Sequence, residues 1–191
     1  NQKRFVMQGL YLENDQAGVI YSSFGVNGAK TDTYFRCEDF ETHLKSLSPD
    51  LVIISLGTND AYMTNFNSET YEQNMLALLN KVKLASPEAS ILVTSSGDNY
   101  RYKRYTNKNN AKVQSKLLKL LQERKLALWD FYQVMGGLGS INKWYANGLA
   151  RRDKIHLSQR GYTLQGKLFF NAIIKTYQQF VKNKKANLGA N

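Results

Sequence analysis

The stretch "LVIISLGTND" places a cluster of small polar residues directly after an apolar run. Gly57 allows the backbone to turn sharply, and Asn59 can hold a carboxamide over the end of the run. A neutral donor fixed in this way suits a developing oxyanion, because it stabilises negative charge without being ionised itself. The same residues could instead form a turn that ends a strand, in which Asn59 and Asp60 satisfy their own backbone.

A second pattern, "RRDKIHLSQRGY", places Asp153 three residues before His156. At that spacing the carboxylate can bind one imidazole nitrogen and fix the tautomer of the other, which is the orienting half of a nucleophile, base and acid triad. His43, the other histidine, lies in a predicted helix and is interpreted as a surface residue. A DxxH pattern on its own has many accidental matches.

The loop "SSGDNYRYKRYTNKNN" interleaves tyrosines with cations. Aromatic rings stack on sugars, and arginine holds carboxylates in a bidentate way, so the loop would suit an acidic glycan; the alternative is an ordinary solvated loop. Trp144, in a Gly-rich loop, could line an acyl pocket. The substrate-binding candidates are Gly57, Asp60, Tyr100, Arg101 and Trp144.

These residues must be positioned by an α/β framework. Three buried strands are predicted in "DLVIISLG", "SILVTSSG" and "LALWD", and each is followed by a helical pattern. The repetition predicts a mostly parallel sheet in a three-layer αβα arrangement, whose ligands bind beyond the carboxyl ends of the strands. "DLVIISLG" is apolar on both faces, so we expect helices on both sides of it.

The two ends of the chain have separate predictions. The runs Phe5 to Leu12 and Ala17 to Val26, separated by "ENDQ", favour a β-hairpin or two adjacent strands. A last helix is expected over about Thr163 to Val181, followed by a fraying polar end. We therefore divide the chain into an arm over 1–17, one domain over 18–182 and a tail over 183–191.

Composition excludes several classes of protein. The 191 residues suit one domain, and a single cysteine permits neither an intrachain disulfide framework nor a cysteine-rich zinc site. No metal site and no cofactor are predicted, since there is neither a histidine and carboxylate spacing for zinc nor a nucleotide-binding fingerprint. No run of apolar residues is long enough to span a membrane. The net charge of +11 comes without a nucleic-acid-binding signature, so we expect no nucleic-acid partner.

Taken in order, "GVNGA", "GTND" and "DKIHLSQRGY" resemble three of the four signature blocks of the SGNH (GDSL-type) esterase and acylhydrolase superfamily. The resemblance implies a flavodoxin-like sheet and four roles. Gly28 would give a backbone N–H and Asn59 its side-chain amide to an oxyanion hole, His156 would be the general base, and Asp153 would orient it. Over about Gly18 to Val181 the chain is most similar to secreted Bacteroidetes acylhydrolases, including those thought to remove O-acetyl groups from carbohydrate or peptidoglycan.

The block that supplies the serine in this superfamily is missing, because no GDS triplet occurs in the sequence. The resemblance therefore implies a nucleophile upstream of Asn1, a sheet that lacks its first and central strand, and a chain that is inactive alone. Ser96, at the end of "ILVTSS", is the local alternative.

These patterns lead to one main functional hypothesis. The protein would hydrolyse carboxylic esters through a serine acyl-enzyme, acting on acetyl or short acyl groups of a carbohydrate or cell-wall glycan. Its location would be periplasmic or secreted. The alternative is a noncatalytic carbohydrate-binding or interaction module on the same scaffold.

Overall fold

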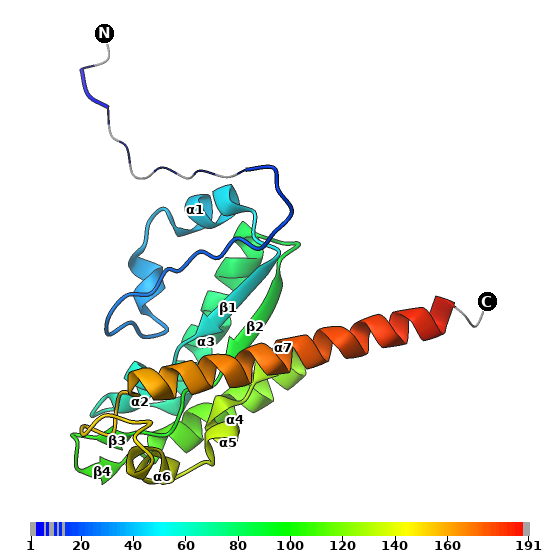
Figure 1. Ribbon diagram of the computed structural model, residues 1–191. Helices are drawn as coiled ribbons and strands as arrows, with labels where there is room; N and C mark the ends of the chain where they lie inside the picture. Colours follow the sequence, from blue (N-terminus) through cyan, green and yellow to red (C-terminus); the bar gives the residue numbers. More distant parts are fainter. Residues whose placement is uncertain (1–2, 6, 8–9, 11, 13, 189–191) are drawn as a thin grey trace.

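The computed structural model describes residues 3–5, 7, 10, 12 and 14–188, without the side chains of 186–188. At its centre is a three-stranded sheet in the order β1-β2-β5, in which both pairings are parallel (Figure 1). The three strands are β1 (Leu51–Ser55), β2 (Ser90–Thr94) and β5 (Ala127–Trp129). The prediction of an α/β fold built on a parallel sheet is confirmed.

Helices and one small hairpin surround this sheet. The remaining elements are η1 (Thr33–Arg36), α1 (Phe40–Leu47), α2 (Thr58–Tyr62), α3 (Ser68–Ala85), β3 (Tyr100–Arg101), β4 (Tyr105–Thr106), α4 (Asn109–Glu123), α5 (Phe131–Met135), α6 (Ser140–Ala146) and α7 (Gln159–Leu188). β3 and β4 pair antiparallel as a separate two-stranded sheet. Both α2 and this hairpin lie beyond the carboxyl ends of the parallel strands (Figure 1).

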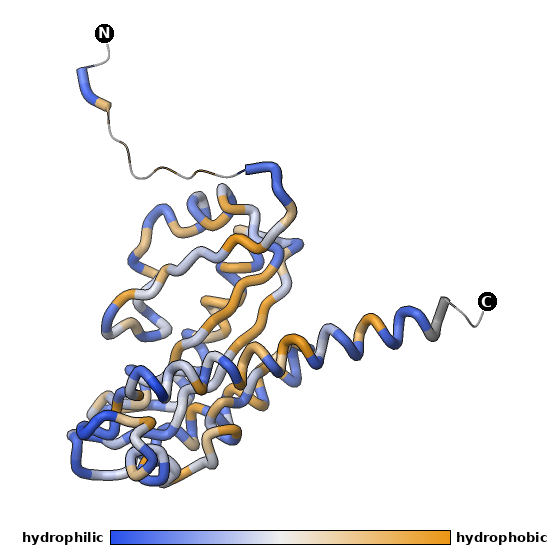
Figure 2. Tube along the Cα trace, viewed as in Figure 1, coloured by the Kyte–Doolittle hydropathy of each residue, from blue (hydrophilic) through white to orange (hydrophobic). Residues whose placement is uncertain are grey.

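The main core lies between one face of the sheet and the helices α3 and α4. Ile54 and Val93, which are register partners on β1 and β2, pack there with Met75 of α3 and Leu117 of α4. Figure 2 shows the strands as the most continuously hydrophobic part of the trace. The helical periodicity of the sequence therefore identified the residues of α3 and α4 that face the sheet.

The opposite face of the sheet is covered unevenly. On β5, Trp129 packs against Phe169 of α7, with ring centroids 4.8 Å apart. On β1, Leu51 and Ile53 keep 45% and 39% of their surface exposed. The expectation that helices cover both faces of this strand was wrong. In the described part of the chain β1 is one edge strand of the sheet. The Phe169 to Trp129 contact of α7 is made on β5, at the opposite edge.

The expected N-terminal hairpin is not formed in the described residues. Ala17 to Val26 has no regular secondary structure, and Val19 keeps 95% of its surface exposed. A strand needs a neighbour to satisfy its backbone groups, and β1, the available edge, is not paired with this run. Residues 6, 8, 9 and 11 of the first run lie outside the described residues, so that half of the prediction is not tested.

The last helix is longer than expected. α7 runs for 30 residues and projects beyond the rest of the molecule (Figure 1). The predicted tail at 183–191 is therefore helical up to Leu188, and 189–191 lie outside the described residues. None of the helices described is long and apolar enough to span a membrane.

Candidate active site

The turn after β1 depends on a glycine. Gly57 has a φ of +124°, a backbone conformation that residues with a side chain rarely adopt. A Cβ at this position would also lie 3.0 Å from Cγ1 of Val113 and 3.3 Å from the Tyr71 hydroxyl. Glycine therefore lets the chain leave the sheet and start α2 at once, which places Asn59 at the edge of the sheet.

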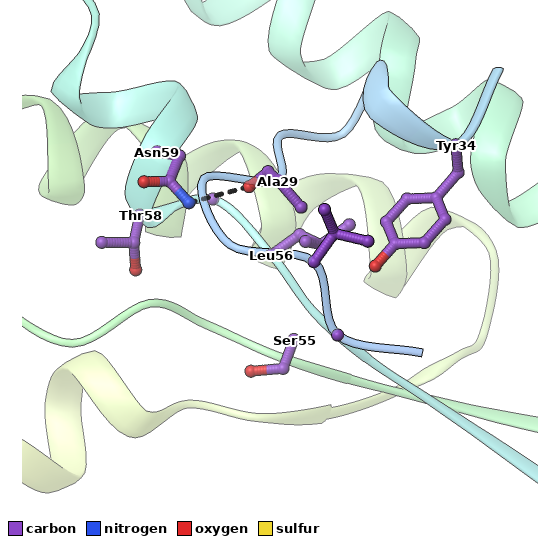
Figure 3. Close-up of a pocket in the computed structure, with 9 residues that line it drawn as sticks. Ala29, Tyr34, Ser55, Leu56, Thr58 and Asn59 are labelled. Atoms are coloured by element: carbon purple, nitrogen blue, oxygen red, sulfur yellow. Dashed lines mark hydrogen bonds between the residues drawn. The ribbon is translucent and has the colours of Figure 1, made fainter. Parts of the chain in front are cut away.

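The side chain of Asn59 is held by a loop that precedes it by about 30 residues. Its Nδ2 donates a hydrogen bond of 2.9 Å to the carbonyl of Ala29 (Figure 3). The other N–H of the carboxamide has no acceptor among the described residues. Asn59 is therefore fixed in orientation and still has one donor available for a ligand.

Gly28 lies in the same loop, in a turn closed by the Ala29 N–H and the Val26 carbonyl. Its φ of +74° is the left-handed conformation that the third position of a type II turn requires. In the described part of the chain its N–H has no acceptor. Gly28 thus immediately precedes Ala29, whose carbonyl accepts the hydrogen bond from Asn59.

Asp60 anchors the loop rather than facing a ligand. Its carboxylate is buried and accepts hydrogen bonds from the backbone N–H and the hydroxyl of Thr31, the latter at 2.7 Å. Burial raises the pKa of Asp60, while the bonds from Thr31 oppose that rise. This geometry argues for a structural role and against the substrate contact expected from the sequence.

A small hollow opens at the carboxyl end of β1. It has a volume of about 210 Å³ and is lined by Gly25, Val26 and Ala29 of the preceding loop, by Tyr34 and by the segment from Ser55 to Asn59. Figure 3 shows Ser55, Thr58 and Asn59 around this space. The volume has room for a small group such as an acetyl moiety, and Asn59 lies at its wall. Gly28 belongs to the same loop but is not among the residues that line the hollow.

The DxxH pattern forms a closed turn. An isolated bridge between Ala150 and Leu157 closes its base, and Asp153 Oδ1 accepts the backbone N–H groups of Ile155 and His156. Asp153 Oδ2 lies 2.9 Å from Nδ1 of His156. An ionised carboxylate here favours a proton on Nδ1, and in the neutral ring that tautomer leaves Nε2 as an acceptor, the form that a general base needs.

The electrostatics of the turn favour the ionised carboxylate. Burial acts to raise the pKa of Asp153, but the hydrogen bonds from the His156 ring and from the backbone of His156 and Ile155 outweigh it and lower the pKa to about 2. The His156 side chain keeps 59% of its surface exposed. The ring is therefore oriented from one side and open on the other.

No direct contact joins Asn59 to His156 in the described residues, but the β3–β4 hairpin connects their segments. The backbone N–H of Tyr100 donates to the carbonyl of Lys154, and that of Tyr102 donates to the hydroxyl of Tyr62 in α2. The two halves of the predicted site therefore lie along the same edge of the sheet.

Sequence reasoning missed the residues that hold α2 and the His156 turn in place. Asn107 and Asn109 both donate to the carbonyl of Ala61. Lys154 has a φ of +52°, donates to Asn142 and lies over the rings of Tyr100 and Tyr145. The asparagines that flank the hairpin in "DNYRYKRYTNKNN" were the one available signal.

The aromatic candidates differ in their surroundings. Trp144 is buried, donates its indole N–H to the Met135 carbonyl and meets the Phe131 ring edge to face. It is a core residue here, which argues against the predicted acyl pocket. Tyr100 donates its hydroxyl to Asn142, whereas Arg101 lies at a second hollow beside the hairpin.

No serine hydroxyl in the described residues is hydrogen-bonded to His156. The hydroxyl of Ser95 donates to Asp130 and accepts from the Tyr132 N–H. Ser96 is buried, and its hydroxyl has no partner there. Ser55 lines the first hollow and accepts a hydrogen bond from Thr94. Within the part of the chain that the structure describes, no cluster of three or more side chains could hold a metal ion.

Comparison with known proteins gives a consistent picture. The model of the GDSL-like lipase/acylhydrolase family matches residues 5–164. No curated protein is similar enough to count as a match.

Three solved structures illustrate the similarity of fold. A peptidoglycan O-acetylesterase is 24% identical with a TM-score of 0.77, over 83% of this chain and 47% of that one. A GDSL-like lipase from Bacteroides thetaiotaomicron is 22% identical with a TM-score of 0.57, over 78% and 73%. A carbohydrate esterase family 3 protein from Talaromyces cellulolyticus is 16% identical with a TM-score of 0.62, over 80% and 70%. The chain thus spans about half the length of the first of these structures.

Proposed function

Because this chain belongs to the GDSL-like lipase/acylhydrolase family, we propose that it supplies the general base and the oxyanion-binding groups for hydrolysis of a carboxylic ester. The observation that carries the proposal is the Asp153 to His156 contact of 2.9 Å, with Nε2 left open. His156 takes the proton of a serine hydroxyl as the serine oxygen attacks the ester carbonyl. Asn59 Nδ2 and the Gly28 N–H stabilise the oxyanion that forms.

The remaining steps use the same residues. When the bond between the acyl carbon and the leaving oxygen breaks, His156 returns its proton to that oxygen. Water then attacks the acyl-enzyme while His156 takes a proton from it, and the acid is released with the serine restored.

The serine itself is proposed to lie on a segment outside these 191 residues. Two observations support this: no GDS triplet occurs in the sequence, and within the described ranges one edge of β1 has no paired strand, with Leu51 and Ile53 exposed. A strand paired in parallel with β1 would end at the edge of the sheet that carries Asn59. It would also cover apolar surface that is now exposed to water.

An acetylated glycan is the proposed substrate. The support is the small hollow beside Asn59, which fits an acetyl group, together with the peptidoglycan and carbohydrate esterases of similar fold. Such a substrate would place the protein in the periplasm or outside the cell.

Activity measurements test the proposal. The 191-residue chain and a longer form of the protein that includes its upstream segment are assayed with p-nitrophenyl acetate. We expect turnover only in the longer form. There, Asn59→Ala should lower kcat by about 10² to 10³, the usual cost of one lost oxyanion donor.

Two results would contradict it. Full kcat in the Asn59→Ala variant would remove the oxyanion assignment, and robust activity of the 191-residue chain would require a local nucleophile. Gly166→Ala is the matched control, since a Cβ at Gly166 on α7 meets nothing within 4 Å.

One observation favours a second candidate. Since no hydroxyl of the described serines is hydrogen-bonded to His156, the scaffold could serve as a noncatalytic carbohydrate-binding module. The absence of a serine-bearing block in the longer form would favour that function.

A further inference from the structure

The β3–β4 hairpin concentrates positive charge and aromatic rings beside the proposed site. Tyr100 pairs with Thr106 and Arg101 with Tyr105, and the turn between them has Tyr102 and Lys103 at positive φ. The Arg104 N–H closes a β-turn on the Arg101 carbonyl, and positive φ values at both central residues of such a turn are usually supplied by Asn or Gly. Here the turn keeps two large side chains in that conformation, and such strain is often retained where a site needs it.

A hollow of about 260 Å³ lies against this hairpin. Arg101 and Lys108 contribute its cations, and Tyr102 and Tyr105 its rings. Both tyrosines are more than half exposed. Exposed rings beside a concave surface offer flat faces on which sugars stack.

The cations of the hairpin have no carboxylate partner among the described residues. Some lysines elsewhere do have such partners: Lys116 contacts Glu69 and Glu72, and Lys81 contacts Glu41. By contrast, no ion pair involves Arg101, Lys103, Arg104 or Lys108 in the part of the chain that the structure describes. The hairpin thus carries uncompensated positive charge, which attracts anions.

Arg101 is held ready for a ligand. Its Nη2 donates to the Tyr102 hydroxyl at 3.2 Å, and the guanidinium lies 4.9 Å from the centre of the Tyr102 ring. Tyr102 is fixed in turn, because its hydroxyl is hydrogen-bonded to Thr64. An arginine immobilised in this way loses little side-chain entropy on binding, and its fork matches a carboxylate.

The hairpin also lies between the two halves of the proposed active site, through its bonds to Lys154 and Tyr62. We propose that it is a subsite for a carboxylate-bearing sugar of the substrate glycan. The proposal rests on the proposed function, because the sugar held here would present the ester of a neighbouring unit to Asn59 and His156.

Binding measurements on the 191-residue chain test this subsite without any need for catalysis. Tri-galacturonate, which carries one carboxylate per sugar, is compared by calorimetry with its methyl-esterified form. We expect the carboxylated trisaccharide to bind about tenfold more tightly, with an affinity that falls as salt rises. Arg101→Gln should remove that preference, whereas Lys175→Gln, the same charge change on an exposed residue of α7, should leave it intact.

Three results would overturn the subsite: equal binding of both trisaccharides, binding of neither, or a preference that survives Arg101→Gln. Tighter binding of a single-stranded oligonucleotide would assign the hairpin to nucleic acid instead. An inactive longer form with intact binding contradicts the esterase proposal alone, and active enzyme without binding contradicts the subsite alone.

Discussion

The two oxygens of the Asp153 carboxylate have different functions. One oxygen accepts backbone N–H groups that shape the turn, and the other orients the His156 ring. Because the same side chain builds the turn and directs the base, the backbone bonds that hold Asp153 in the turn also keep its second oxygen aimed at the ring. This explains how an exposed histidine can keep a defined tautomer.

A titration of Asp153 checks that coupling. Its pKa of about 2 should rise toward the ordinary carboxyl range in His156→Ala, since the ring hydrogen bond is lost while the backbone bonds remain. Folding lowers this pKa, so the stability that Asp153 contributes is fully present above its unfolded pKa and is lost as the pH falls toward 2. Carboxyl chemical shifts measured by NMR against pH give the value directly.

The other histidine provides the control. His43→Ala should leave Asp153 titrating at about 2. An unchanged pKa in His156→Ala, or an equal rise in both variants, would mean that the ring does not stabilise the carboxylate.

At the residue scale, contacts between residues that are close in the sequence could be predicted. The role of a residue could not be predicted where it depends on a partner far away in the sequence. Asp153 and His156 were predictable because their spacing alone brings them into contact. Asp60 was not, because its partner Thr31 lies 29 residues away and nothing local marks the bond. Trp144 was not, since burial depends on how α5 and α6 pack.

At the element scale, a close contact joins the His156 turn to α7. Gly161, in the first turn of the helix, approaches the carbonyl of Leu149 so closely that an added Cβ would collide with it. The same carbonyl accepts the Ser158 N–H, and the Ser158 hydroxyl donates to Gly148. The first turn of α7 can therefore pack against the Leu149 carbonyl only because residue 161 has no side chain.

Two glycine substitutions on α7 should act in opposite directions. Gly161→Ala should lower the free energy of unfolding by about 1–3 kcal/mol, the usual cost of overpacking. Gly166→Ala, where a Cβ meets nothing within 4 Å, should raise it by about 0.5–1 kcal/mol through helix propensity. Urea unfolding monitored by circular dichroism measures both, and equal changes of the same sign would contradict the contact.

Elements with strong internal periodicity were the predictable ones. α3 and α4 follow their apolar spacing closely, and the three parallel strands fall on the expected runs. Ala17 to Val26 has the composition of a strand but no regular structure, because composition does not supply the neighbour with which a strand must pair. Burial on the second face of β1 was unpredictable for the same reason.

At the scale of the whole molecule, exposed apolar surface lies on the irregular run from Val19 to Val26, on β1 and on α7. On β1 it comes from Leu51 and Ile53, and on α7 Phe170, Tyr177 and Phe180 are each more than half exposed. An unpaired edge beside an uncovered apolar face is a template for association with another chain.

We therefore expect the 191-residue chain to self-associate, as sedimentation velocity over a range of concentrations would show. Ile53→Lys should weaken association by about tenfold, because a charge on an open strand opposes pairing. Leu84→Lys, at a leucine of α3 that keeps 79% of its surface exposed, should have no such effect. Equal weakening by both variants would assign association to general hydrophobicity.

The unpaired edge of β1 also has a practical consequence. If one added strand supplies the missing serine, this chain is one part of a split enzyme. Its esterase activity then depends on whether that strand is bound to β1. Fused to one of two proteins, with the strand fused to the other, it would release a coloured alcohol only when the two meet.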